Sequence, residues 1–550
     1  MTAVTSPPTR TAPAPERRGG SRQDLAGTGT LLRLALRRDR LLIPVWVILL
    51  AVLATQSAVA VEQFYPTAAE RADMARSTNA NASMRAIYGP VFEPTLGAVS
   101  VWELLTTGSV LIAIVSMVIV VRHTREEEET GRQELISAAV VGHRAPLTAA
   151  LLAAAVANAA AAVLIALGLI GIGLPTAGSV ATGLTIGGTG MVFAAFAALA
   201  AQLTESARLA KGLTGAALGA AFMLRAAGDS GTADGSSPLA WLSPLGWTRN
   251  VRPYADERFW VLLLMVALTV VVSAVAYGLA GRRDVGASFL ATRPGPAEGR
   301  IGGVYGLAWR LQRGSLLGWG TGFALGGFAF GAMADGADEL IGDNEQSREI
   351  IERMGGAQGI TDAFLAAMIG LFGMLAAIYA VSAVLRMRGE ETSERAEPLL
   401  ASVLPRLRWA SSHLVIAYAG SVLLLLVSGL TTGLGYGLAA GDMGQVWRAT
   451  GASLAQTPAV WLLAGAAVLL FGALPALSVA AWGLVVVVLV IGWIGPSLDL
   501  PQSVMNISPF THLPKLPGAE VTAAPYLWLL LLAAVPLVAG IAAFRRRDIG

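Results

Sequence analysis

Two short acidic runs contain the residues of this sequence best suited to specific chemistry. The first reads REEEETGRQELISA from Arg125 to Ala138, and the second reads RGEETSERAEPLLAS from Arg388 to Ser402. Both contain Glu-Glu-Thr, then Arg-x-Glu, then an aliphatic pair. A lone run of charge is usually a solvated connection between helices. Because this run recurs with an apolar stretch after it, we predict that both runs are docking points for a cytoplasmic partner.

Catalytic and metal-binding chemistry have no candidate residues in the sequence. There is no cysteine, and the four histidines (His123, His143, His413 and His512) are too scattered to form a ligand cluster. The motifs G-x-x-x-x-G-K-[ST], H-E-x-x-H and G-x-S-x-G do not occur. We therefore predict a non-enzymatic chain that binds no cofactor, so that any ATP hydrolysis belongs to another polypeptide.

Composition indicates that lipid surrounds most of the elements that position these runs. Hydrophobic residues make up 55% of the chain and charged residues only 14%, which excludes an ordinary soluble protein. Two long segments, Ala145 to Thr204 and Ala449 to Leu498, contain no Asp, Glu, Lys or Arg. Each is long enough for two membrane spans. The predicted fold class is therefore an all-α integral membrane protein.

Apolar runs of suitable length predict about twelve transmembrane helices. The first six lie near residues 41–61, 101–121, 147–173, 179–203, 210–227 and 259–280, and the second six near residues 316–334, 361–385, 412–438, 457–475, 477–495 and 525–544. The run 210–227 is short, and the long run around Pro475 has to be divided into two spans.

The distribution of arginine predicts the orientation, since short basic loops stay in the cytoplasm. Arginines cluster before the first span, between the sixth and seventh spans, and at the chain end; they are Arg33, Arg37, Arg38, Arg40, Arg282, Arg283, Arg310, Arg545, Arg546 and Arg547. Both termini are then cytoplasmic, and residues 1–26 form a disordered cytoplasmic tail. The outer loops are about 62–100, 228–258, 335–360 and 496–524. Abundant Ala, Gly and Arg indicate a bacterial source, and hence the plasma membrane.

Four matched signals in the same order predict a tandem duplication. They are LRRDRLL (36–42) and LQRGSLL (311–317), the two acidic runs, Ser-Pro at 243–244 and 508–509, and RRDVG (282–286) and RRDIG (546–550). We predict two six-span halves, 27–290 and 304–550, joined by a cytoplasmic linker at 291–303 and related by a pseudo-two-fold axis along the membrane normal. The first pair predicts short amphipathic helices on the inner membrane face, with Arg37, Arg38 and Arg40 in one and Arg310 and Arg313 in the other.

Small and ionisable residues within the spans give two further expectations. Glycines four residues apart favour close helix packing within the chain; these are Gly215 and Gly219, Gly318, Gly322 and Gly326, and Gly429, Gly433 and Gly437. The predicted midplanes carry no ionisable residue, because Glu62, Glu103, Glu205 and Asp362 lie near helix ends. Ion-coupled carriers usually place such groups at mid-membrane. A pathway of this kind suits a hydrophobic or amphipathic substrate.

The motifs EEETGRQELISA, RRDVG and RRDIG, with an amphipathic helix before the first span, resemble the ABC-2 type permeases. More narrowly, the chain from Gly27 to Gly550 is similar to the fused, double-length actinobacterial permeases that export polyketide antibiotics such as tetronasin. The resemblance implies a type V exporter-like fold with cytoplasmic coupling helices. It also implies that the second and fifth spans of each half line the pathway, although the sequence does not identify pathway residues.

In that family the loop after the second span of each half docks an ABC ATPase. The resemblance places Glu128, Glu129, Arg132, Glu134 and Leu135 in the first coupling loop, and Glu390, Glu391, Arg395, Glu397 and Leu399 in the second. It implies two ATPase copies that hold ATP and Mg²⁺ and drive rocking of the halves. The extra Glu394 and Pro398 predict weaker or asymmetric docking in the second half.

The resulting functional prediction is the permease subunit of an ATP-driven exporter of antibiotics, drugs or lipids, with a role in antibiotic resistance. Its other partners would be the bilayer and a hydrophobic small molecule, and no nucleic acid. Two alternatives stay open. An ion-coupled secondary multidrug carrier also has two six-span halves, and a membrane scaffold or sensor would use the long outer loops to bind a ligand. The sequence does not name the substrate.

Overall fold

The computed structural model describes residues 24–137, 140–232, 234–282, 302–334, 359–495 and 501–547. Within these ranges all regular structure is helical, and ten helices are long and apolar enough to cross a membrane. The chain is therefore an all-α integral membrane protein, as predicted. It divides into two compact units, Met1–Pro294 and Gly295–Gly550, which we call the first and second halves. Most of the predicted tail and linker lies outside the described residues.

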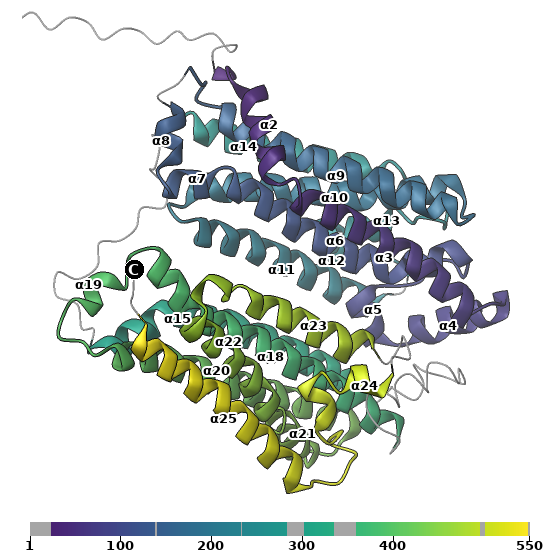
Figure 1. Ribbon diagram of the computed structural model, residues 1–550. Helices are drawn as coiled ribbons and strands as arrows, with labels where there is room; N and C mark the ends of the chain where they lie inside the picture. The colour runs from purple at the N-terminus through teal and green to yellow at the C-terminus, as the bar shows by residue number, and fades with distance from the viewer. Residues whose placement is uncertain are drawn as a thin grey trace, which may run out of the picture. The chain divides into compact units, whose positions relative to one another are not determined.

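The long helices of the first half lie side by side around α6 and α10 (Figure 1). They are α3 (Leu42–Phe64), α6 (Leu96–Arg122), α9 (Ala145–Gly171), α10 (Thr176–Leu203), α11 (Ala207–Gly231) and α14 (Val261–Ala280). Of the most apolar 18-residue stretch of α10, 72% is buried within the structure, so α10 is the centre of this half. Glycine makes that position possible, because a Cβ on Gly183 would lie 2.3 Å from the carbonyl oxygen of Ala162 in α9.

Short helices occupy the two ends of the first half (Figure 1). One end carries α2 (Thr28–Arg38), α7 (Arg125–Glu129) and α8 (Arg132–Ser137), and we call it the acidic end. The opposite end carries α4 (Ala68–Ala80), α5 (Ala82–Tyr88), α12 (Pro238–Trp241) and α13 (Pro244–Asn250). The side chain of Thr67 and that of Glu70 form a reciprocal capping box at the start of α4.

The second half packs around α18. Its long helices are α15 (Val304–Ala334), α18 (Ile360–Thr392), α20 (Arg406–Ala440), α22 (Thr457–Ala473), α23 (Ala480–Ile494) and α25 (Ala523–Arg546), with shorter helices α19 (Glu397–Leu400), α21 (Gln445–Leu454) and α24 (Gln502–Met505). Two 3₁₀ turns, η1 (Pro475–Leu477) and η2 (Pro509–His512), complete it. Trp409, Phe471 and Phe544 form a buried aromatic cluster at its acidic end, where the second acidic run lies.

The predicted spans are confirmed for ten helices, and helices also form at the other two positions. These two, α11 and α23, are the fifth long helices of their halves. The α11 helix carries more charge, including Lys211 and Arg225, and α23 has only 15 residues. The predicted division near Pro475 is correct: the η1 turn separates α22 from α23, because proline lacks the N–H that would continue a helix.

Two sequence predictions are wrong in the second half. The segment 311–317 is not a separate short helix, because α15 runs unbroken from Val304 to Ala334. Gly318 and Gly322 do not pack against another helix, since a Cβ on either would meet nothing within 4 Å. Close contact between α15 and α20 uses Gly331 instead, where a Cβ would lie 2.0 Å from the carbonyl oxygen of Thr432.

Of the other two sets of glycines predicted to mediate helix packing, one does so and the other does not. Gly429, Gly433 and Gly437 do mediate close packing, against Thr450, Val446 and Asp442 respectively. Gly215 and Gly219 of α11 have open space where a Cβ would lie. Four-residue spacing alone therefore did not reveal which glycine face meets a neighbouring helix.

Candidate functional site: the acidic loops and a polar pocket

The first acidic run is tied to the rest of its half by three of its four consecutive glutamates, and the fourth, Glu128, pairs within the run. Glu126 pairs with Lys211 of α11, Glu127 with Arg38 of α2 and Arg132, Glu128 with Arg125, and the Glu129 carboxylate accepts the backbone N–H of Ala207, 2.8 Å away. Ala207 is the first residue of α11, where a carboxylate is favoured by the helix dipole. The base of this loop is thus fixed to α2 and α11.

Asp39 makes a second tie between α2 and the end of α6. It lies in the break between α2 and α3 and is fully buried. Its carboxylate accepts a hydrogen bond from Arg122 at 2.7 Å and lies 2.6 Å from Nε2 of His123. Asp39 belongs to the repeated motif LRRDRLL, but no role was predicted for it from the sequence. The signal that could have found it is a single acid inside a basic run.

The predicted coupling residues of the first half separate into a bound base and an exposed tip. Glu128 and Glu129 belong to the base, whereas Arg132 and Glu134 are exposed at the start of α8. The backbone of Leu135 lies in α8, and its side chain is outside the described part of the structure. Arg37 of α2 and Arg40, in the turn after it, flank the same corner and are exposed, while Arg38 holds Glu127.

The second acidic run has a different base. Because α18 continues to Thr392, Glu390 and Glu391 lie in its last turns. Glu390 pairs with Arg386 at 3.2 Å, and Glu391 pairs with Arg388 at 3.3 Å and with Arg547. Arg547 also donates to the carbonyl oxygen of Phe471, 2.9 Å away. The chain end therefore fastens this loop to α22.

The tip of the second loop resembles that of the first in charge but not in backbone. Arg395 and Glu397 are exposed, and Leu399 is partly buried against the core of the second half. Both loops take a left-handed conformation directly before the arginine, at Gly131 (φ 70°) and at Glu394 (φ 58°), which is uncommon for a residue other than glycine. The loops differ in where the next helix begins: α8 starts at Arg132 itself, whereas α19 starts at Glu397, after Arg395. Arg310 and Arg313 are exposed on the first turns of α15.

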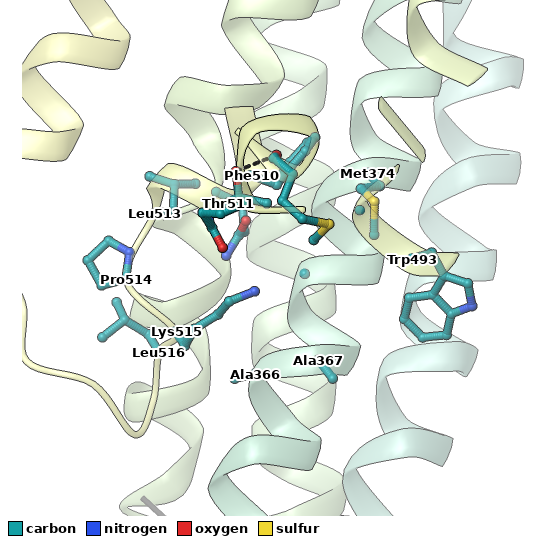
Figure 2. Close-up of a pocket in the computed structure, with 15 residues that line it drawn as sticks. Ala366, Ala367, Met374, Trp493, Phe510, Thr511, Leu513, Pro514, Lys515 and Leu516 are labelled. Carbon is teal, nitrogen blue, oxygen red and sulfur yellow. Dashed lines mark hydrogen bonds between the residues drawn. The ribbon is translucent and has the colours of Figure 1, made fainter. Parts of the chain in front are cut away.

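A polar pocket lies at the opposite end of the second half, between α18, α23 and residues 502–516 (Figure 2). Its volume is about 190 Å³. Apolar residues such as Met374, Trp493 and Phe510 line one part, and Gln456, Gln502, Thr511 and Lys515 supply polar groups. The sequence placed 502–516 in an outer loop without singling out any residue. The rarity of lysine could have singled out Lys515, because the chain has only two lysines.

An apolar groove of about 400 Å³ lies on the first half between α9, α10 and α14. Its floor includes Asn158, whose amide donates to Ser116 and to the carbonyl oxygen of Ala154. Its rim carries the exposed side chains of Val266 and Val270 on α14. A groove of this composition suits a hydrocarbon chain better than a polar ligand.

Comparison with known proteins identifies the family to which this chain belongs. Residues 301–545 match the family described as the C-terminal domain of the multidrug efflux system permease Rv1217c. Over 544 residues the chain is 45% identical to the multidrug efflux system permease protein Rv1217c of Mycobacterium tuberculosis (strain ATCC 25618 / H37Rv). The chain belongs to the Rv1217c family of multidrug efflux permeases. The alignment covers 98% of each chain, so the relative matches both halves.

Membership of the Rv1217c family makes this chain a multi-pass transport permease, which agrees with the permease predicted from sequence. It also agrees with a non-catalytic transport subunit, because a permease is the membrane component of a transport system. The narrower resemblance to ABC-2 type permeases and tetronasin exporters stays a prediction from the loop motifs.

Proposed function

We propose that this chain is the transmembrane subunit of an ATP-driven exporter that moves hydrophobic or amphipathic compounds out of a bacterial cell. Its substrates would be antibiotics, drugs or lipids, and export would confer resistance. ATP is hydrolysed on a separate ABC ATPase, two copies of which bind the acidic ends of the two halves. The permease then lies in the plasma membrane, with its acidic ends and both termini on the cytoplasmic side.

The observation that carries this proposal is the recurrence of an exposed Arg and Glu pair beyond a fixed loop base. Arg132 and Glu134 are exposed in the first half, and Arg395 and Glu397 in the second. The Arg132 side chain stays 53% exposed although it lies 3.6 Å from Glu127. Exposed, oppositely charged side chains can form charge-assisted hydrogen bonds with a partner surface. The glutamates of the base are already paired within the chain, so they are better suited to hold the loop than to bind the ATPase.

The fixed bases give the loops a mechanical role. In the first half, a displacement of the tip acts on α2 through Arg38 and on α11 through Lys211 and Ala207. In the second half it acts on α18 directly and on α22 through Arg547. Rigid connections of this kind let closure of two ATPase copies move whole helices, which a flexible loop could not do.

The test is to purify the tagged full chain in mild detergent from its native membranes and to assay the preparation for ATP hydrolysis. We expect an ATPase to co-purify with the wild type and to be lost from the double variant Glu134→Ala plus Glu397→Ala. The matched control is Glu93→Ala plus Glu520→Ala, which removes one exposed carboxylate from each half at the opposite ends and should retain the ATPase.

The alternatives give different results in the same preparation. A chain that purifies alone and transports drugs on an ion gradient, without ATP, would be a secondary carrier. A chain that purifies alone and moves no substrate after reconstitution would be a scaffold or sensor. Either result contradicts the exporter proposal, as does equal loss of ATPase from the control variant.

A further inference from the structure

The polar pocket of the second half contains a cation, Lys515, for which the described part of the chain supplies no counter-charge. Figure 2 shows Lys515 extending from its loop toward the middle of the pocket, near Thr511. Among the described residues, Lys515 forms no ion pair and no hydrogen bond through its ammonium group. Burial lowers the pKa of Lys515, because the charged ammonium loses water without gaining a partner. An anion in the pocket would restore that lost stabilisation.

A second unpaired polar group lies behind the pocket wall. Ser508 is fully buried, and its hydroxyl has no hydrogen-bond partner in the described part of the chain. That hydroxyl is 3.6 Å from the position of a Cβ on Gly492, a residue that lines the pocket. Buried polar groups without partners are rare in folded proteins and often mark a place where a ligand or water binds.

The first half shows how such a cation is satisfied when it has a structural role. Arg249 lies six residues after Ser243 in the repeated Ser-Pro motif, and Lys515 lies seven residues after Ser508. The buried Arg249 guanidinium donates to Thr106 Oγ1 at 2.7 Å and to the carbonyl oxygen of Trp102 at 3.3 Å. Lys515 has no comparable acceptors among the residues that the structure describes, and it faces the pocket. Each half therefore has a cation six or seven residues after its Ser-Pro motif, but within the described residues only the cation of the first half is completed by protein groups.

The other residues that line the pocket indicate which chemical groups, besides an anion, the ligand contains. Met374, Trp493, Phe510 and Leu516 provide apolar surface, and Ala366, Ala367 and Gly370 of α18 leave room for a chain. Gln456 and Gln502 add neutral hydrogen-bonding groups. One positive charge among apolar walls selects a molecule with one negative headgroup and a hydrocarbon part.

We propose that this pocket binds the anionic headgroup of an amphipathic molecule, with the headgroup beside Lys515 and the apolar part against Met374, Trp493 and Phe510. A carboxylate or a phosphate fits this chemistry, and the source is either a transported acid or an anionic lipid. The inference rests on the proposed function only in calling the bound acid a substrate, because binding itself requires neither ATP nor an ATPase.

The experiment measures binding to the purified full chain in nanodiscs of uncharged phosphatidylcholine, with empty nanodiscs as background. The probes are radiolabelled dodecanoate and dodecyltrimethylammonium, which share a chain length and differ in headgroup charge. Loss of one charged hydrogen bond predicts that Lys515→Gln binds dodecanoate about tenfold more weakly than the wild type. Binding of the cationic probe should not weaken.

Three control variants separate charge, shape and folding. Lys515→Arg should return dodecanoate affinity to near the wild-type value, and Glu520→Gln, an exposed charge on the same loop, should not reduce it. A Cβ on Gly370 meets nothing within 4 Å, so Gly370→Leu should fold normally and weaken binding by filling the pocket. Equal dodecanoate affinity of the wild type and Lys515→Gln overturns the proposal, as does no binding to the wild type above background.

Phosphatidylglycerol added to the nanodiscs distinguishes the two sources. If the natural ligand is a lipid, this lipid displaces dodecanoate from the wild type; if it is a transported acid, dodecanoate stays bound. Both results support an anionic headgroup site. Failure of the ATPase to co-purify would contradict the proposed function and leave this binding result unaffected, so the two proposals fail separately.

Discussion

The corner between α2 and α3 in the first half has no counterpart at the matching position of the second half. In the first half, LRRDRLL contains Asp39, and α2 ends at Arg38 before α3 begins at Leu42. In the second half, LQRGSLL has Gly314 at the matching position, and α15 passes straight through. A buried carboxylate that needs partners on another helix fixes a break, whereas nothing interrupts the helix where that carboxylate is missing.

The partners of Asp39 are missing from the second half as well. Arg122 and His123 lie six and five residues before Glu128; Val384 and Leu385 lie six and five residues before the matching Glu390. The whole network, and not one residue of it, is thus restricted to the first half. The second loop uses Arg547 at the chain end instead. The two halves thus share a similarly charged, exposed tip but differ in the structure that supports it.

The largest effect should come from Asp39→Asn, which leaves Arg122 and His123 beside a neutral, buried amide. Removal of one partner from a buried charge network costs about 3 kcal/mol, so we expect a marked fall in Tm of the purified chain, measured by scanning fluorimetry in detergent. The matched change Gly314→Ala should raise stability by about 0.5 to 1 kcal/mol, because it removes glycine from a helix interior. A similar loss in both variants would contradict the asymmetry.

The next effect should come from Arg547→Gln, which leaves Glu391 with Arg388 alone and removes the donor to the Phe471 carbonyl. The side chains of Arg547 and Glu391 are 14% and 5% exposed, so the expected loss is about 1 to 3 kcal/mol. The exposed neighbour Arg546→Gln is the control and should change stability little. A Tm equal to that of the control would show that the chain end does not hold the second loop.

A smaller effect is expected from Lys211→Gln, which breaks the pair with Glu126. Both side chains are about one-third exposed, at 35% and 36%, and water screens a pair of this kind to between 0 and about 1 kcal/mol. The Tm should fall slightly at low salt, and the difference from wild type should disappear as salt is raised. A large, salt-independent loss would mean that the pair is more deeply shielded than its exposure indicates.

The smallest effect on stability should come from the exposed tips. We expect Glu134→Ala and Glu397→Ala, made singly, to change folding stability by no more than about 0.5 kcal/mol, because neither side chain is buried. Their effect on ATPase co-purification should be unequal, with Glu134→Ala causing the greater loss, since α8 holds both Arg132 and Glu134, whereas Arg395 lies before α19 begins. Equal losses would indicate that the two tips dock equally well.

Much of the helical arrangement could be predicted because each span is a local apolar run with ends marked by charge or proline. Examples are the helix from Leu42 to Phe64 and the break between two helices at Pro475, both of which the local sequence is enough to predict. The prediction failed for the segment 311–317, because the repeated motif led us to predict the same short helix in both halves. Whether a helix breaks there depends on Asp39 and its distant partners, and only one half has them.

The sequence by itself determined that this protein is a two-part bundle of membrane helices with repeated acidic loops, since hydropathy, charge and repetition are properties of residues close together in the chain. Only the tertiary structure decided which charges are already paired. Asp39 meets Arg122 across 83 residues, and Arg547 meets Glu391 across 156. The position of the Lys515 ammonium, which no described residue pairs, is equally a consequence of packing, because a cavity exists only where separate helices and a loop do not fill the space between them.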